Sequence, residues 1–141
     1  MSEDLQRFLD AQRNGYDGIV RELRAGRKTS HWIWFVFPQV AGLGRSGMSA
    51  LYAISGLDEA RAYLAHPVLG ARLRECAGIV ADSKAPSAEA IFGDLDALKV
   101  RSSMTLFLRA DPTEAVFMRV LDRFYGGEVD VRTDQLLGAP G

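Results

Sequence analysis

The chain has 141 residues, of which 48% are hydrophobic and 25% are charged, a composition typical of a globular protein rather than a disordered one. A formal net charge of −1 argues against a general electrostatic attraction to nucleic acid or to anionic membranes. A single cysteine cannot form an internal disulfide or a zinc cluster, and His31 and His66 are far apart in sequence, so we expect no metal site and no cofactor.

The expected organisation is one globular domain over residues 1–141, with a loose C-terminal tail over residues 138–141. The acidic N-terminus lacks the apolar region of a signal peptide. The longest apolar run, residues 32–38, is too short to span a bilayer. We therefore expect a cytoplasmic protein without a membrane partner.

Apolar residues recur at helical spacing along most of the chain, and glycine, proline and short polar residues separate these stretches. The pattern indicates amphipathic helices packed around a core. In chain order, the expected helices lie within residues 4–15, 16–26, 55–64, 66–80, 87–93, 94–108, 111–126 and 131–137.

Several polar residues have a structural explanation. Ser87 and Asp130 stand where a helix N-cap is expected. His66 precedes Pro67 at a helix start, so a capping or packing role is favoured over chemistry. Cys76 has no His or Asn neighbour in sequence, and we expect a small core residue rather than a nucleophile.

Only residues 32–37 and 104–108 have the composition of strands. Each run is so apolar that it fits a buried strand or a buried helix equally well, and no further strand is evident to pair with either. We therefore predict an all-α or mainly α protein, a compact orthogonal bundle of about six to eight helices, several of them short.

The densest signal is the aromatic run that contains Trp32 and Trp34, which follows a basic segment. Such a run must be buried, and polar groups beside it can form the rim of a ligand pocket. If Lys28 and His31 lie on one helical turn, they face the same side, where a lysine can hold a phosphate and the imidazole can act as a general acid or base. The alternatives are a solvated basic run and a histidine satisfied within the core.

Residues 42–47, GLGRSG, formally match the G-x-G-x-x-G pattern of dinucleotide-binding proteins. That interpretation is disfavoured, because no strand directly precedes the loop and no alternation of strands and helices follows it. A tight loop whose glycines supply positive φ angles is the simpler interpretation. An intermediate one keeps an anion on the backbone N–H groups of the loop, with Arg45 and Ser46 as further donors.

Residues 99–105 combine two cations and three hydroxyl side chains within seven positions. Short hydroxyls in the middle of a helix lower its stability because they can bond to the backbone. The segment is therefore either a loop between helices or a helix whose hydroxyls are used for contacts. A close helix–helix contact through small residues is the structural alternative.

The chain resembles the family called domain of unknown function 1810 from Leu5 to about Leu137. This resemblance implies a mainly helical, monomer-sized domain, and it implies no assigned reaction, cofactor or partner. Polar residues within the shared motifs are harder to explain by packing alone, which favours a shared site. The motifs are RFLDAQ (7–12), SHWIWFVFPQ (30–39) with Lys28, GLGRS (42–46), DEARAYLAHPVLGARLREC (58–76), IFGDLDALKVRSSMTLF (91–107) and the terminal RTDQLL.

The favoured function is a small-molecule site for a phosphate-bearing or other anionic ligand, at the junction of SHWIWFVFPQ and GLGRS. Whether it is an enzyme stays open; His31 is the candidate catalytic residue. The alternative is a non-catalytic interaction or structural module with an aromatic core, present as a monomer or weak homodimer. The candidate ligand-binding residues are Lys28, Trp32, Trp34, Gln39, Gly42, Gly44, Arg45, Ser46, Lys99, Ser102 and Ser103.

Overall fold

The computed structural model describes residues 5–138, and within this range the chain forms ten helices and one isolated bridge, between Val40 and Ile54. In chain order the helices are α1 (Gln6–Gln12), α2 (Tyr16–Arg24), α3 (Ile33–Val36), α4 (Gly47–Leu51), α5 (Leu57–Ala65), α6 (Leu69–Ala81), α7 (Ala88–Phe92), α8 (Asp94–Ala110), α9 (Ala115–Tyr125) and α10 (Val131–Leu137).

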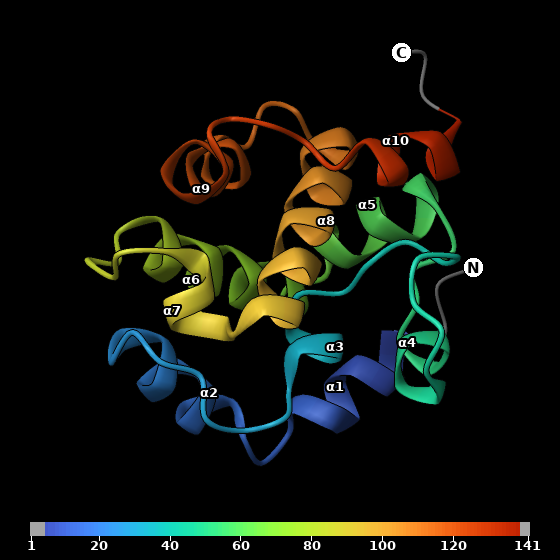
Figure 1. The fold of residues 1–141 in the computed structure, drawn as a ribbon. Coiled ribbons are helices and arrows are strands. Elements are labelled where there is room, and N and C mark those ends of the chain that lie inside the picture. Colours follow the sequence, from blue (N-terminus) through green and yellow to red (C-terminus); the bar gives the residue numbers. More distant parts are fainter. Residues whose placement is uncertain (1–4, 139–141) are drawn as a thin grey trace.

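Helix α8 is the centre of the fold. It runs through the middle of the molecule, with α9 and α10 at its C-terminal end and α7 and α3 close to its first turns (Figure 1). Its Phe107 is fully buried, and the ring centroids of Tyr63 and Phe117 lie 5.4 and 5.9 Å from that of Phe107. These apolar contacts join α5, α8 and α9 into one core, since burial of aromatic surface is a major source of folding free energy.

The predicted all-helical fold is confirmed for the described residues, but the expected number of six to eight helices is too low. The two additional helices are α3 and α4, which have only four and five residues. In α3 the aromatic run is helical rather than extended, because the carbonyl of Ile33 accepts from the N–H of Phe37 and no neighbouring strand is needed. Residues 104–108 likewise belong to α8.

The predicted capping residues are confirmed. Ser87 accepts a hydrogen bond from the backbone N–H of Ala90, and Asp130 accepts one from that of Thr133. His66 accepts from the N–H groups of residues 68 and 69 through Nδ1, so it caps the start of α6. Cys76 is buried, as predicted, and burial raises the pKa of its thiol to about 12, which keeps it protonated.

Two contacts fix the segment between α2 and α3 against the core. The backbone N–H of Lys28 donates to the carbonyl of Ile91 in α7 at 2.7 Å. The side-chain amide of Gln12 donates to the carbonyl of Phe35 at 2.6 Å, and Gln12 itself is 2% exposed. Residues 28–36 are therefore held between α1, α7 and the first turns of α8.

None of the described helices combines the length and apolar character needed to cross a membrane. The predicted loose tail lies outside the described residues, apart from Gly138, and the assignment of a single domain stays a prediction.

Candidate functional site

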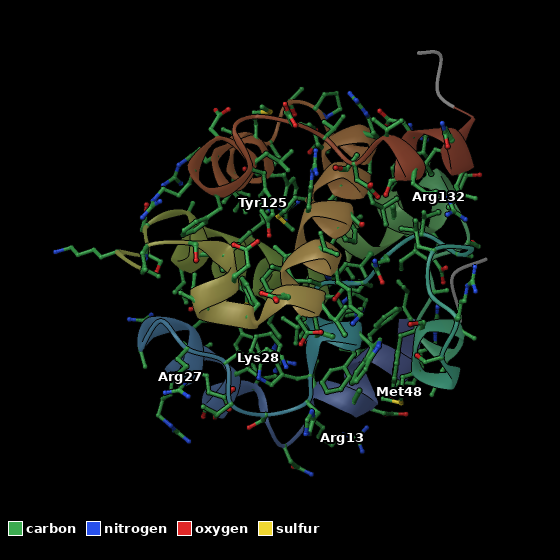
Figure 2. All side chains as sticks on the ribbon, viewed as in Figure 1. Arg13, Arg27, Lys28, Met48, Tyr125 and Arg132 are labelled. Carbon is green, nitrogen blue, oxygen red and sulfur yellow. The ribbon has the colours of Figure 1, made fainter. Side chains whose placement is uncertain are left out.

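Lys28 points into the molecule from the segment between α2 and α3. Its neighbour Arg27 lies at the outer edge, as Figure 2 shows. The Lys28 side chain is 8% exposed, and its ammonium nitrogen lies 2.8 Å from a carboxylate oxygen of Asp96. A buried ammonium needs such a partner, because transfer of an unpaired charge out of water is costly.

Asp96 holds a second lysine as well. Its other carboxylate oxygen lies 3.0 Å from the ammonium nitrogen of Lys99, one turn further along α8. Burial raises the pKa of Asp96, but the hydrogen bonds from Lys28 and Lys99 outweigh this effect and hold that pKa below its usual range. The two lysines and the ionised aspartate together carry one excess positive charge.

Each lysine also lies over a tryptophan ring. The ammonium nitrogen of Lys28 is 5.3 Å from the ring centroid of Trp32, and that of Lys99 is 5.8 Å from the ring centroid of Trp34. Both distances allow a cation–π attraction. We call these five residues the lysine–tryptophan cluster: Lys28, Trp32, Trp34, Asp96 and Lys99.

Two buried donors, one in α3 and one in α8, lack an acceptor among the described residues. The indole nitrogen of Trp34 and the hydroxyl of Ser103 have no hydrogen-bond partner within the described part of the chain. Ser103 follows Lys99 by one turn on the same face of α8. Neighbouring hydroxyls do find acceptors, since Ser102 donates to the carboxylate of Asp130 and Thr105 donates to the carbonyl of Arg101. Buried polar groups without partners are rare, and each calls for an explanation such as a bound water or ion or a functional role.

The edge of Trp32 meets a second polar group, the carboxylate of Glu22 in α2. The indole N–H of Trp32 donates to Glu22 Oε1 at 2.9 Å, and the backbone N–H groups of Thr29 and Ser30 donate to the same oxygen. The hydroxyl of Ser30 donates to Oε2. Burial raises the pKa of Glu22, but these hydrogen bonds outweigh it and lower the pKa to about 2.

His31 does not join Lys28, contrary to the expectation that both lie on one helical turn. Residues 27–32 are not helical, so the spacing of three positions does not bring the two side chains to one side. Lys28 turns inward to Asp96, whereas His31 is exposed and lines a separate hollow with Glu22, Trp32 and Phe35.

The glycine loop lies away from the lysine–tryptophan cluster. The chain leaves α3 and crosses to the edge of the molecule where α4 begins (Figure 1). Gly42 has a φ of +103°, and a Cβ added to it would lie 3.1 Å from the side chain of Leu136 in α10. Ser46 caps α4 by accepting from the N–H of Ser49, and Arg45 is exposed. Gly42 fits the interpretation of a loop whose glycines supply positive φ angles, whereas Gly44 and Gly47 do not have a positive φ. The position of the loop separates the two halves of the predicted junction.

Two further predicted residues have structural partners. The hydroxyl of Ser102 donates to Asp130 at 2.8 Å, which attaches α8 to the start of α10. The carbonyl of Gln39 accepts from the N–H of Ile54, next to the isolated bridge. The structure therefore gathers Lys28, Trp32, Trp34 and Lys99, with Ser103 one turn away, and places the remaining predicted residues elsewhere.

Comparison with known protein families shows which family the chain belongs to. The family described as "Protein of unknown function (DUF1810)" matches residues 2–137, nearly the whole chain. The chain belongs to the DUF1810 family. It is also similar to the crystal structure of the conserved hypothetical protein Rv1873 from Mycobacterium tuberculosis, at 52% sequence identity and a TM-score of 0.94, over 97% of this chain and 98% of that one. No curated protein matches the sequence.

The DUF1810 resemblance drawn from the motifs is thus confirmed, whereas two acidic residues of the site were missed. Asp96 lies within the motif IFGDLDALKVRSSMTLF, three positions before Lys99, and this spacing was a usable signal for an ion pair on one helix face. Glu22 gave no such signal, because its partners lie in a non-helical segment whose path the sequence does not reveal.

A surface depression of about 840 Å³ in this DUF1810 chain contains none of the predicted site residues. It lies between the end of α2, the end of α6 and residues 82–86. Three of its charged groups already have partners: Arg74 pairs with Glu114, Asp82 pairs with Arg119, and Glu75 accepts a hydrogen bond from Tyr16. Size alone does not make a binding site, since polar groups must also converge on a ligand. In the described residues, no group of three or more His, Cys, Asp or Glu side chains could hold a metal ion.

Proposed function

We propose that this chain binds a small molecule with an anionic group, and that the lysine–tryptophan cluster holds that group. The observation that carries the proposal is an excess of positive charge and of hydrogen-bond donors at one place. Two ammonium groups share a single carboxylate, the unpartnered indole N–H of Trp34 belongs to the ring below Lys99, and the unpartnered Ser103 follows Lys99 by one turn of α8.

The donor excess can be stated for each lysine. An ammonium group has three N–H donors and no acceptor. Lys28 and Lys99 each direct one hydrogen-bond contact to Asp96, and a ring face receives part of the remaining charge. A phosphate or carboxylate offers several acceptor oxygens and forms shorter, stronger bonds to charged donors than a neutral group does.

Exposure assigns different positions to the two lysines. The Lys99 side chain is 24% exposed, compared with 8% for Lys28, so an anion arriving from solvent meets Lys99 first. Lys28 then fixes Asp96 from behind and supplies positive charge at short range. The half-buried ring of Trp34, below Lys99, provides an apolar wall for the part of the ligand next to its anionic group.

The proposal uses five of the residues predicted from the sequence: Lys28, Trp32, Trp34, Lys99 and Ser103. It concerns binding and gives no role to the glycine loop, to Gln39 or to Ser102. His31, the candidate acid or base, lines the hollow that also contains Glu22, Trp32 and Phe35. A catalytic role for His31 would therefore need a ligand that reaches past Trp32.

Calorimetric titration tests the proposal with inorganic phosphate, pyrophosphate, glucose 6-phosphate, AMP and citrate as probes. We expect at least one probe to bind, and Lys99→Met to weaken that binding about tenfold, because it removes a charge-assisted hydrogen bond. Lys84→Met is the matched control, since it removes an exposed lysine that lies outside the cluster. Absence of binding by every probe, or an equal loss in the two variants, would overturn the proposal.

A second candidate function rests on exposed apolar side chains. Leu95 and Leu98 in α8 and Val131 at the start of α10 are 74%, 58% and 64% exposed. The bond from Ser102 to Asp130 brings these helices together, so the three side chains are candidates for one apolar surface. This observation favours a protein-interaction module. Sedimentation of wild type and Leu98→Lys over a range of concentrations tests whether this surface binds a second copy of the chain. If both proteins stay monomeric at every concentration, self-association through this surface is excluded.

A further inference from the structure

A hollow of about 330 Å³ lies between α2 and the segment that leads into α3. Six of the residues around it matter for the argument: Gly15, Gly18, Glu22, His31, Trp32 and Phe35. We call it the α2 hollow. Its size suits a small molecule, at the lower end of the range for ligand pockets. It differs from the lysine–tryptophan cluster in charge, because Glu22 is its only acidic or basic residue besides His31.

The carboxylate of Glu22 is a fixed acceptor with capacity for another donor. A carboxylate has about four lone-pair positions, two on each oxygen. Oε1 already accepts from Thr29, Ser30 and Trp32, whereas Oε2 accepts only from the hydroxyl of Ser30. The ring of donors holds the group ionised and restricts its orientation. Oε2 therefore retains a lone-pair position for one further donor.

Gly18 has no side chain to fill the space beside this acceptor, but a glycine at this position lowers the stability of α2. Glycine inside a helix destabilises it by about 1 kcal/mol relative to alanine. A Cβ on Gly18 would meet no atom closer than Nη2 of Arg21, at 3.7 Å, and a Cβ on Gly15 would meet nothing within 4 Å. Packing within the protein therefore does not require glycine at either position. The missing side chains leave the backbone of α2 accessible from the hollow.

We propose that the α2 hollow binds an uncharged, hydroxyl-bearing molecule of about monosaccharide size, with a ligand hydroxyl donating to Glu22 Oε2. Trp32 and Phe35 form the apolar wall against which the carbon skeleton of the ligand packs. This site goes beyond the proposed function, since it shares only Trp32 with the lysine–tryptophan cluster and takes a neutral ligand.

Charge distinguishes this ligand class from two others. An anion in the hollow would be repelled by the ionised carboxylate of Glu22. A cation would find that carboxylate already compensated by four donors. A neutral hydroxyl needs only the free acceptor position.

Titrations followed by ¹⁵N–¹H spectra of the tryptophan indoles test the proposal, with Trp34→Phe used to assign the two resonances. The probes are D-ribose, D-glucose, D-galactose and D-mannose, with tetramethylammonium as the cationic comparison. We expect at least one sugar to move the Trp32 resonance. Failure of every sugar, or a response to tetramethylammonium alone, would overturn the proposal.

Two glycine variants show whether the response comes from this hollow. Gly18→Ala narrows the hollow and Gly18→Leu fills it, so we expect binding to weaken in that order, by about tenfold for the leucine variant. Gly78→Ala is the matched control, since its Cβ would meet only Val116 at 4.0 Å, within another helix. Thermal unfolding should show Gly18→Ala to be at least as stable as wild type. Sugar binding that is unchanged in Gly18→Leu would also overturn the proposal. Because Trp32 belongs to both sites, the variants separate them: Lys99→Met affects anion binding and Gly18→Leu affects sugar binding, so failure at one site is distinguishable from failure at the other.

Discussion

The segment before α3 and the loop after it differ sharply, although both belong to the motifs that mark the family. Lys28 is buried against Asp96, and the tryptophans that follow it lie under two ammonium groups. The loop at residues 42–46 is mostly exposed, with its serine used as a cap and its Arg45 directed to solvent. The polar residues of one family motif thus belong to a candidate binding site, whereas those of the next motif form a turn and a helix cap. The predictions below test this difference, in order of decreasing effect.

Loss of the shared carboxylate should have the largest effect on stability. Asp96→Asn leaves two ammonium groups without a counter-charge, and we expect a loss of about 3 kcal/mol in the free energy of unfolding, measured in urea. Asp94→Asn, in the same first turn of α8, removes an exposed carboxylate and serves as the control. Adding Lys28→Met to Asp96→Asn should recover part of the loss. Equal costs for the two asparagine variants would contradict a structural role of this ion cluster.

The four hydrogen bonds that the Glu22 carboxylate accepts, which we call the Glu22 clamp, predict a specific dependence of stability on pH. The pKa of Glu22 falls from its ordinary value of 4.5 to about 2 on folding, so its stabilisation is present above pH 4.5 and is lost as the pH falls towards 2. We expect the clamp to contribute on the order of 2 kcal/mol, since its bonds are charge-assisted.

The comparison of wild type with Glu22→Gln isolates this contribution. The difference in unfolding free energy between wild type and Glu22→Gln should shrink as the pH falls from 4.5 towards 2. Glu128→Gln, at an exposed carboxylate, should follow wild type throughout. Parallel curves for wild type and Glu22→Gln would show that the hydrogen bonds to this carboxylate do not stabilise the fold.

The glycine loop should respond to changes in shape and not to changes in charge. A Cβ added at Gly44 would overlap the side chain of Ser49, so Gly44→Ala should cost about 1–2 kcal/mol. Arg45→Ala should change stability by less than about 0.5 kcal/mol. Neither variant should alter the affinity for an anion in calorimetric titration. A loss of anion affinity in Arg45→Ala would instead restore the loop as part of the site.

Local patterns were sufficient for much of this fold and for part of the candidate site. Helical spacing and caps such as Ser87, His66 and Asp130 depend on residues close in sequence, and their assignments are confirmed. The pairing of Lys28 with Asp96 spans 68 positions and depends on how α7 and α8 fold back onto the segment before α3. No sequence periodicity encodes such a contact. The condition under which Lys28 and His31 would face one side, a shared helical turn, is not met, because the chain is irregular there.

The indole resonance of Trp34 provides the most direct test of the lysine–tryptophan cluster as an anion site. Its N–H is buried without an acceptor in the described structure and belongs to the ring beneath Lys99. Titration with phosphate or with the phosphorylated probes, followed in ¹⁵N–¹H spectra, should move this resonance in wild type and in Arg45→Ala, and should move it much less in Lys99→Met. A Trp34 resonance that stays fixed with every anion, or that moves equally in Lys99→Met, would contradict the account.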